Sequence, residues 1–321
     1  MRRVREAVVA MELAAKLVDA RETPFLYGTT PPREGADAET IQTAAAKLAE
    51  RVRHLPLDGF VVYDLQDESL RTDLPRPFPF VRTVDSRAYS QLLTRLSGVP
   101  AITYECIGPL TEDEWRRWLD ESAALGVRCL SLVGHPTSRG APWPMTLARA
   151  FQLAAAHHAG FTLGGVAIAE RCGATPSEAT RMVEKTANGC RFFVTQAVYD
   201  PEATVLLLRD YSRACRDRGL APCRVVLTFT PCGREKTMTF MKWLGIAISA
   251  ATERAILAAP SPLARSIEVC SDNLRTVLAQ PGFEDVPLGV NVESVAITRD
   301  EIDGSVALCG ELAAVLAHPP R

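Results

Sequence analysis

Eight short apolar runs alternate with longer helical segments along this chain, and this alternation limits its fold more than any other feature. The runs cover residues 25–30, 59–65, 101–107, 129–135, 162–169, 191–199, 223–231 and 287–297. Most are continuous apolar stretches, which is typical of parallel strands buried on both faces. Regular alternation of strand and helix favours a parallel sheet. The sequence therefore predicts eight βα units.

Eight βα units in about 290 residues predict a closed (β/α)8 barrel, the TIM-barrel form of an α/β fold. An open doubly wound sheet is the alternative, but it would need a Gly-rich phosphate turn after the first strand. The segment 31–33 (PPR) stands there instead. Because no linker divides the chain, we expect one domain over 1–321. It comprises a leading helix within 1–22 and a barrel over 24–317, with extra helices over 246–285 before the last strand.

Charge and cysteine content exclude several classes of function. The chain has 36 Lys and Arg against 38 Asp and Glu, a net charge of −2. We therefore expect no nucleic-acid partner and no membrane-surface partner, and no apolar run is long enough for a membrane span. Nine cysteines without CxxC spacing indicate reduced thiols in a cytoplasmic protein and no metal site.

Polar side chains gather at the predicted carboxyl ends of the strands, where the active sites of such barrels lie. They include Tyr27, Tyr63, Glu105, His135, Glu170, Gln196, Thr228, Thr230, Asn291 and Glu293. Burying an unpaired charge is costly, so Glu105, Gln196 and Glu293 must face partners, water or a ligand. The alternative for each is a hydrogen bond or ion pair with a neighbouring strand. His135 is equally compatible with a structural role.

One block at the sixth strand carries a family resemblance. Residues 185–200 read KTANGCRFFVTQAVYD. This resembles the K-x-x-A-G-A-x-x-x-x-T-Q-x-x-F-D run of the methylenetetrahydrofolate reductases, flavin-dependent (β/α)8 barrels of one-carbon metabolism and methionine biosynthesis. Weaker matches fall in order over 24–250, at 31–33, 106–108, 132–136, 165–170 and 230–231.

The resemblance implies roles for several residues. Gln196 matches the amide that contacts the folate, and a side-chain amide both donates and accepts hydrogen bonds, which suits the edge of a pterin ring. Around it we expect Tyr27, Thr230 and Glu293 to bind the substrate. Lys185 matches a lysine near the flavin phosphates, for which a solvated helix residue is the alternative. With Lys185, we expect Glu170 and Arg181 to bind the cofactor.

The departures from the family pattern are as informative. Gly28 stands where the family has its catalytic glutamate, and His135 stands where it has an aspartate near the flavin. Glycine cannot transfer a proton, so we expect a general acid from another strand: Glu105 first, then Glu170 and Glu293, with His135 also a catalytic candidate. A carboxyl group buried beside an apolar ligand has a raised pKa, which suits such an acid. The lost contacts predict weakened or absent FAD binding.

The resemblance implies an NAD(P)H-linked oxidoreductase that acts on the one-carbon unit of 5,10-methylenetetrahydrofolate. The expected partner is a small-molecule folate, a tetrahydrofolate derivative, and a homo-oligomer is left open. The alternatives are a non-redox folate-dependent one-carbon enzyme and a catalytically silent folate-binding barrel. An unrelated lyase or aldolase barrel is a further alternative, although no predicted strand carries the lysine that a Schiff-base aldolase needs.

Overall fold

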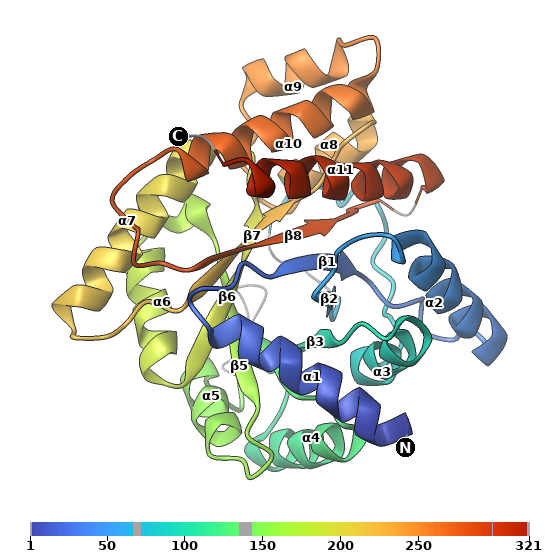
Figure 1. Cartoon of the computed structure of the whole chain (residues 1–321), viewed down its shortest axis with the longest axis vertical. Coiled ribbons are helices and arrows are strands. Elements are labelled where there is room, and N and C mark those ends of the chain that lie inside the picture. The colour runs from blue at the N-terminus through green and yellow to red at the C-terminus, as the bar shows by residue number, and fades with distance from the viewer. Residues whose placement is uncertain (1, 67–71, 135–142, 297, 320–321) are drawn as a thin grey trace.

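The computed structural model describes residues 2–66, 72–134, 143–296 and 298–319, and it confirms the closed barrel. Eight parallel strands pair in chain order, and the last closes the ring against the first (Figure 1). They are β1 (Phe25–Thr29), β2 (Gly59–Val62), β3 (Ala101–Cys106), β4 (Cys129–Val133), β5 (Thr162–Ala167), β6 (Cys190–Ala197), β7 (Arg224–Phe229) and β8 (Leu288–Glu293).

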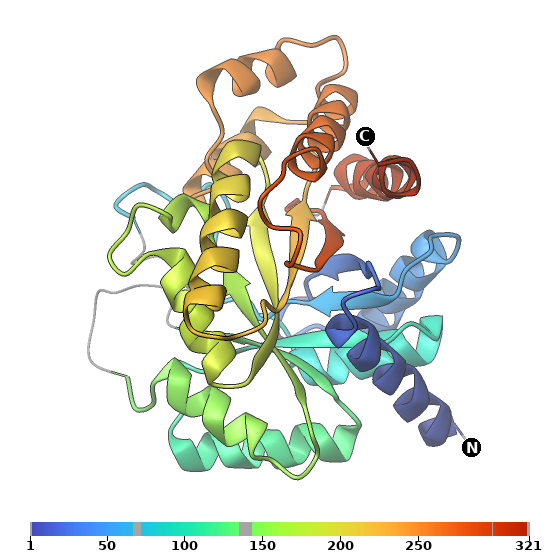
Figure 2. The ribbon, with the colours of Figure 1, turned by 60° about the vertical axis from the view of Figure 1, so that its left-hand side comes forward.

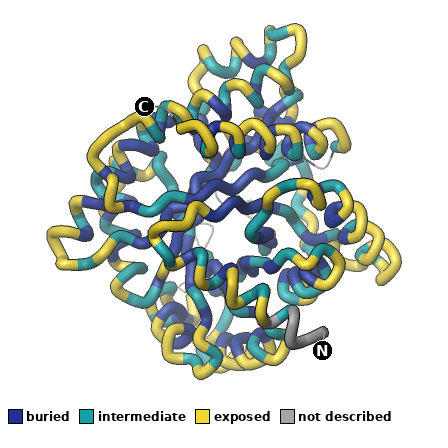
Figure 3. Tube along the Cα trace, in the orientation of Figure 1, coloured by how far each residue is buried: buried dark blue, intermediate teal, exposed yellow. Residues whose placement is uncertain are grey.

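Helices surround this ring in the described part of the chain. They are α1 (Arg2–Val18), α2 (Ala38–Val52), α3 (Ser86–Ser97), α4 (Glu112–Leu125), α5 (Leu147–Ala155), α6 (Glu178–Ala187), α7 (Pro201–Asp217), α8 (Glu235–Trp243), α9 (Ala250–Leu257), α10 (Pro262–Leu278) and α11 (Arg299–Ala317), with a 3-10 turn η1 (Ala169–Arg171). A capping box formed by Thr111 and Glu114 is present at the start of α4. Exposed residues lie on the outer faces of the helices, and the strands are largely buried (Figure 3).

The end of the second strand differs from the sequence prediction. The strand expected over 59–65 ends at Val62, because the Asp64 side chain, not a strand backbone, accepts the Cys106 backbone N–H at 3.1 Å. The extra helices expected over 246–285 are present as α9 and α10, and Pro262, which lacks the N–H that a continuous helix needs, starts the second of them. Both helices extend beyond the ring (Figure 2).

The leading helix α1 closes the amino-terminal end of the barrel. Leu13 and Leu17 are fully buried and form one apolar cluster with inward-facing side chains such as Leu26 and Phe192. Arg224 of β7 donates to the backbone carbonyls of Leu17 at 3.1 Å and Glu22 at 2.7 Å, and also to those of Asp19 and Leu288. This end of the barrel is therefore filled.

Within the described residues, no helix is both long and apolar enough to cross a membrane. All nine cysteines lie in the described part, and none forms a disulfide.

Candidate functional site

The carboxyl end of the barrel differs from the closed end, because partly exposed side chains line its interior. Tyr63, Val133 and Val166 pack against the inner apolar cluster and remain partly exposed. Tyr104 lies beside Tyr63, with ring centroids 4.8 Å apart in an edge-to-face arrangement. This layer therefore offers an apolar and aromatic floor at the end of the barrel where ligands bind.

Gly28 and Glu293 face each other across the first and last strands. Their Cα atoms are register partners. A Cβ added at Gly28 would lie 2.9 Å from the Glu293 Cβ and 2.9 Å from Cε2 of Tyr63, closer than real side chains approach. The glycine thus leaves the space that the carboxyl-bearing side chain of Glu293 and the ring of Tyr63 occupy.

A directed hydrogen-bond network ends at the carboxyl group of Glu293. Asn291 Nδ2 donates to the Tyr63 hydroxyl at 3.0 Å and lies 3.3 Å from Thr228 Oγ1. The Tyr63 hydroxyl in turn hydrogen-bonds to Glu293. Burial raises the pKa of Glu293 to about 7, and the bond from Tyr63 opposes this rise. Near neutral pH this carboxyl group can therefore both give and take a proton.

Gln196 and Thr230 present polar atoms without partners near this network. Gln196 Nε2 donates to the Leu244 carbonyl at 2.7 Å, whereas its Oε1 is buried without a hydrogen-bond partner among the described residues. The same holds for Thr230 Oγ1 and Asn291 Oδ1. Native proteins satisfy most buried polar atoms, so such groups on consecutive strands indicate a site for a polar ligand.

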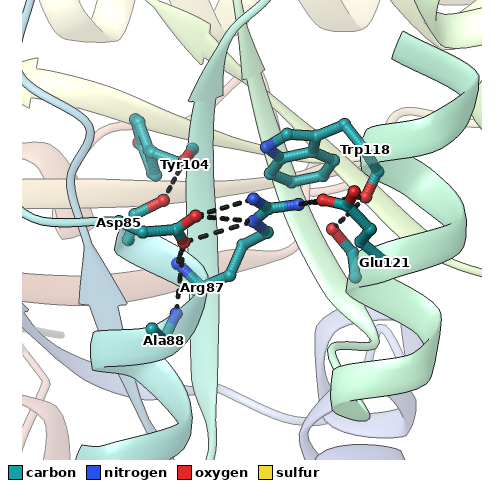
Figure 4. Close-up of polar contacts among 8 residues, drawn as sticks. Asp85, Arg87, Ala88, Tyr104, Trp118 and Glu121 are labelled. Atoms are coloured by element: carbon teal, nitrogen blue, oxygen red, sulfur yellow. Dashed lines mark hydrogen bonds and ion pairs between the residues drawn. The ribbon is translucent and has the colours of Figure 1, made fainter. Parts of the chain in front are cut away.

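Glu105, the first expected general acid, lies on the other face of its strand. Neighbouring residues on a strand point to opposite faces, and Tyr104 faces inward. Burial and the nearby carboxyl group of Asp64 raise the pKa of Glu105 well above its ordinary value, while Arg87 opposes the rise. Figure 4 shows that Arg87 bridges Asp85 and Glu121 beside Trp118, between α3 and α4. Glu105 therefore faces the helix layer rather than the barrel interior.

Tyr27, an expected substrate ligand, is also directed outward. Its hydroxyl lies 2.7 Å from Ser305 Oγ on α11, and the side chain is almost fully buried. Tyr27 thus contacts the helix layer, while Gln196, Thr230 and Glu293 are the expected substrate-binding residues that lie at the barrel mouth.

The three expected cofactor-binding residues are engaged within the protein. Lys185 Nζ donates to the Val166 carbonyl at 2.6 Å and lies 3.9 Å from Glu178 Oε1. Burial lowers the pKa of Lys185. Lys185 is therefore neither free to contact a phosphate nor a solvated residue on the surface of its helix. Glu170 Oε1 accepts the Ala247 backbone N–H at 3.0 Å. Arg181 donates to the Pro176 carbonyl. The described residues therefore do not fit the flavin contacts that the resemblance implies.

His135, the other expected catalytic residue, lies outside the described residues. Elsewhere, contrary to the sequence analysis, Asp120, His157 and His158 bring possible metal ligands within 4.8 Å of one another, on the helix layer. His157 Nδ1 accepts the Ala159 backbone N–H, so in the neutral ring Nε2 carries the proton and is directed at Asp120, 3.1 Å away. A metal would have to displace that proton, which argues against a metal site.

An aromatic cluster that the sequence analysis missed joins the segment after β2 to α8. The Leu74 carbonyl accepts the Trp243 indole N–H at 3.1 Å. The guanidinium carbon of Arg76 lies over the Trp243 ring, 4.9 Å from its centroid. Phe78 meets Phe240 edge to face, with ring centroids 5.2 Å apart. The F-P-F run at 78–80 was the only sequence signal for this contact. The cluster borders the same end of the barrel, because α8 follows β7.

A separate cavity lies beside the start of α7. Its volume is about 560 Å³, and it is lined by residues that include Tyr199, Asp200, Ser249, Thr252 and Asn273. None of the expected site residues that the structure describes lines it. The polar layer inside the barrel mouth and this cavity are therefore distinct candidate positions for a ligand.

The fold and this polar layer define the chain as a (β/α)8-barrel protein with a candidate small-molecule site at its carboxyl end. A solved structure with a TM-score of 0.78 and 31% identity covers 94% of this chain and 99% of its own. It is an uncharacterized protein from Clostridium thermocellum that binds two copies of 5-methyl-5,6,7,8-tetrahydrofolic acid. The chain belongs to the same family as that protein.

The other comparisons with known proteins give no further information on function. A 2,3-dimethylmalate lyase of the PEP mutase/isocitrate lyase superfamily aligns at 12% identity and a TM-score of 0.46, over 82% of this chain and 94% of its own; this likeness carries no functional conclusion. No protein-family model and no curated protein matches the chain.

Proposed function

We propose that this chain binds a reduced folate of the 5-methyltetrahydrofolate class at the carboxyl end of its barrel and acts on the folate's one-carbon unit. The observation that carries the proposal is the 31% identity, over nearly the whole barrel, to a protein that binds 5-methyltetrahydrofolic acid. The resemblance of residues 185–200 to the methylenetetrahydrofolate reductases points to the same substrate class.

The chemistry of the barrel mouth supports this substrate. A pterin ring is flat, with apolar faces and an edge of amide-like donors and acceptors. Tyr63, Val133 and Val166 offer partly exposed apolar surface for such a face. Gln196 Oε1 and Thr230 Oγ1, which have no hydrogen-bond partner among the residues that the structure describes, offer oxygen atoms for its N–H groups. Leaving such buried atoms unpaired costs about 1–3 kcal/mol each, so a ligand that pairs them gains specificity.

The reaction we propose is that of a methylenetetrahydrofolate reductase-like oxidoreductase. NAD(P)H supplies a hydride that reduces the methylene carbon of 5,10-methylenetetrahydrofolate to a methyl group, and one proton goes to the nitrogen that leaves this carbon. We propose that the protein works without resident FAD, because Lys185 is held by Val166 and Glu178 instead of being free for a phosphate.

A second candidate is a non-redox enzyme or a silent binder of the same folate. The observation that favours it is this same mismatch between Lys185, Glu170 and Arg181 and the flavin contacts of the redox family. Both candidates place the folate at the barrel mouth, and they differ only in electron transfer.

An absorbance scan followed by a coupled assay separates these candidates. The purified protein is expected to lack flavin absorbance and to oxidise NADH or NADPH only when 5,10-methylenetetrahydrofolate is present. Folate binding without any NAD(P)H oxidation would replace the redox reaction by the non-redox candidate. Calorimetry that detects no heat with 5-methyltetrahydrofolate would contradict the proposed substrate class.

A further inference from the structure

We propose that Glu293 is the proton donor of this site and that Tyr63 is its positioning residue. The proposal rests on the proposed function and deepens it, because it names the group that exchanges a proton with a nitrogen of the bound folate. The sequence alone favours Glu105 over Glu293 for this role. The arrangement of β1, β2 and β8 reverses that order.

The location of Glu293 is the first observation that supports its role as proton donor. Three glutamates were candidates, and each has a different environment. Glu105 faces α3 and α4 outside the ring, and Glu170 is bound to the Ala247 backbone. Glu293 lies inside the barrel mouth, where its side chain occupies space beside Gly28, and it is partly exposed. It is therefore the one of these three that a ligand at the mouth can reach.

The network around Glu293 is oriented to control one proton. Asn291 donates to the Tyr63 hydroxyl, so the hydroxyl hydrogen is directed to Glu293. Burial raises the pKa of Tyr63 well above its ordinary value, so this phenol stays protonated at neutral pH. A single hydrogen bond from Tyr63 leaves a carboxyl group with capacity for a second partner. A ligand nitrogen can fill that capacity.

The electrostatic surroundings fit the same role. The titratable groups that act on Glu293, or on which it acts, are the phenols of Tyr63 and Tyr104 at the mouth and of Tyr27 behind β1. Within the described chain, no cation contributes to the pKa of Glu293. A carboxyl group held only by burial and a neutral phenol keeps its proton until a base approaches.

The proposed step transfers one proton from Glu293 and one hydride from NAD(P)H. The bond between the methylene carbon and one folate nitrogen breaks, and its electron pair stays on that nitrogen, which takes the proton from the Glu293 carboxyl group. The carbon, left as an iminium on the other nitrogen, accepts the hydride from NAD(P)H, which is oxidised to NAD(P)+. The Glu293 carboxylate then regains a proton from solvent.

The decisive variant is Glu293→Gln, which keeps the shape of the side chain but removes the titrating proton. We expect kcat to fall by about 100-fold or more, the usual contribution of a general acid, while the affinity for 5-methyltetrahydrofolate changes only a few-fold. Glu105→Gln is the matched control, because it alters a buried carboxyl group outside the ring, and it is expected to keep kcat.

Tyr63→Phe tests the positioning role. Removing its hydroxyl removes the hydrogen bond that lowers the pKa of Glu293, so the basic limb of the pH profile of kcat is expected to move to higher pH. A merely structural tyrosine would change stability without moving this limb. Circular dichroism of each variant checks that the barrel is folded.

The experiments distinguish a failure of the proposed function from a failure of the Glu293 inference. Wild-type protein that neither binds 5-methyltetrahydrofolate nor oxidises NAD(P)H overturns the proposed function. Wild-type protein that turns over, with Glu293→Gln at a similar kcat and an unchanged pH profile, overturns the inference alone. Should Glu293→Gln fold poorly, the conservative Glu293→Asp replaces it, and an unchanged pH profile there is equally contradictory.

Discussion

The two ends of the barrel solve the problem of burying polar groups in opposite ways. At the amino-terminal end, the buried Arg224 donates to four backbone carbonyls, and α1 covers it. At the carboxyl end, Glu293, Gln196 and Thr230 also lie inside the barrel. There, however, the buried Oε1 of Gln196 and Oγ1 of Thr230 have no hydrogen-bond partner among the described residues.

This difference indicates that the amino-terminal end serves the stability of the barrel and the carboxyl end serves ligand binding. A charged group whose hydrogen bonds are complete costs little once it is buried, whereas incomplete hydrogen bonding lowers stability. A protein retains such incomplete groups where a ligand completes them. We therefore expect changes at the closed end to alter the free energy of unfolding and changes at the open end to alter folate chemistry.

The largest expected effect is at the closed end. Arg224→Met removes the hydrogen bonds that this side chain donates to four backbone carbonyls, so the free energy of unfolding is expected to fall by about 4 kcal/mol, measured by urea denaturation. Arg191→Met, at an exposed arginine of β6, is the control and should change it by less than about 0.5 kcal/mol. A small effect of Arg224→Met would break the contrast between the ends.

At the open end, Glu293 should make stability depend on pH. Its pKa is 4.5 ordinarily and about 7 in the folded protein, so between these values the folded state binds more protons than the unfolded state. Stability contributed by this group is therefore lost as pH rises through 7, by about 3 kcal/mol. Glu293→Gln is expected to be more stable than wild type at pH 8 and not at pH 4. Parallel pH curves for the two proteins would refute the raised pKa.

A smaller effect is expected at the glycine beside Glu293. Gly28→Ala puts a methyl group 2.9 Å from both the Glu293 and Tyr63 side chains, an overpacking that costs about 1–3 kcal/mol. Unfolding curves should show this loss, and calorimetry should show weaker folate binding. Gly134→Ala is the control, since within the described part of the chain its added methyl meets only Leu147, at 3.6 Å. Equal behaviour of the two variants would mean that the mouth is less tightly packed than described.

The smallest expected effect is on ligand affinity. Gln196→Ala removes one amide contact with the pterin edge, so the affinity for 5-methyltetrahydrofolate is expected to drop about 10-fold, the effect of one hydrogen bond of about 1.4 kcal/mol. Gln152→Ala, at an exposed glutamine of α5, is the control in the same calorimetric titration. Unchanged affinity in Gln196→Ala would remove this residue from the site.

The sequence predicts the fold well, because the barrel is specified locally. Apolar runs of strand length, helix caps such as Thr111 and Asp200, and the regular alternation of elements each act over a few residues. The same local signals place Gln196 and Glu293 at strand ends. The closure by Arg224 could not be predicted, because its partners Leu17 and Glu22 are some 200 residues away in the chain.

The sequence does not show to which face of a strand a side chain points, and this limited the prediction of the site residues. Tyr104 and Glu105 are adjacent, and nothing local decides which of the two faces the barrel interior; the packing of Tyr104 on Tyr63 decides it. The role of Gly28 is similarly non-local. The sequence alone shows only that a carboxylate is missing at Gly28, whereas in the fold the Cβ of Glu293 on the neighbouring strand lies 2.9 Å from the position of a Cβ added there.

The most direct test of the reduced-folate site is a crystal structure of the wild-type protein with 5-methyltetrahydrofolate. We predict that the pterin lies at the carboxyl end of the barrel, with its edge on Gln196 and with the folate nitrogen that leaves the methylene carbon within hydrogen-bond distance of Glu293. A folate found only in the outer cavity beside Tyr199 and Asn273, with the barrel mouth left without it, would contradict the account.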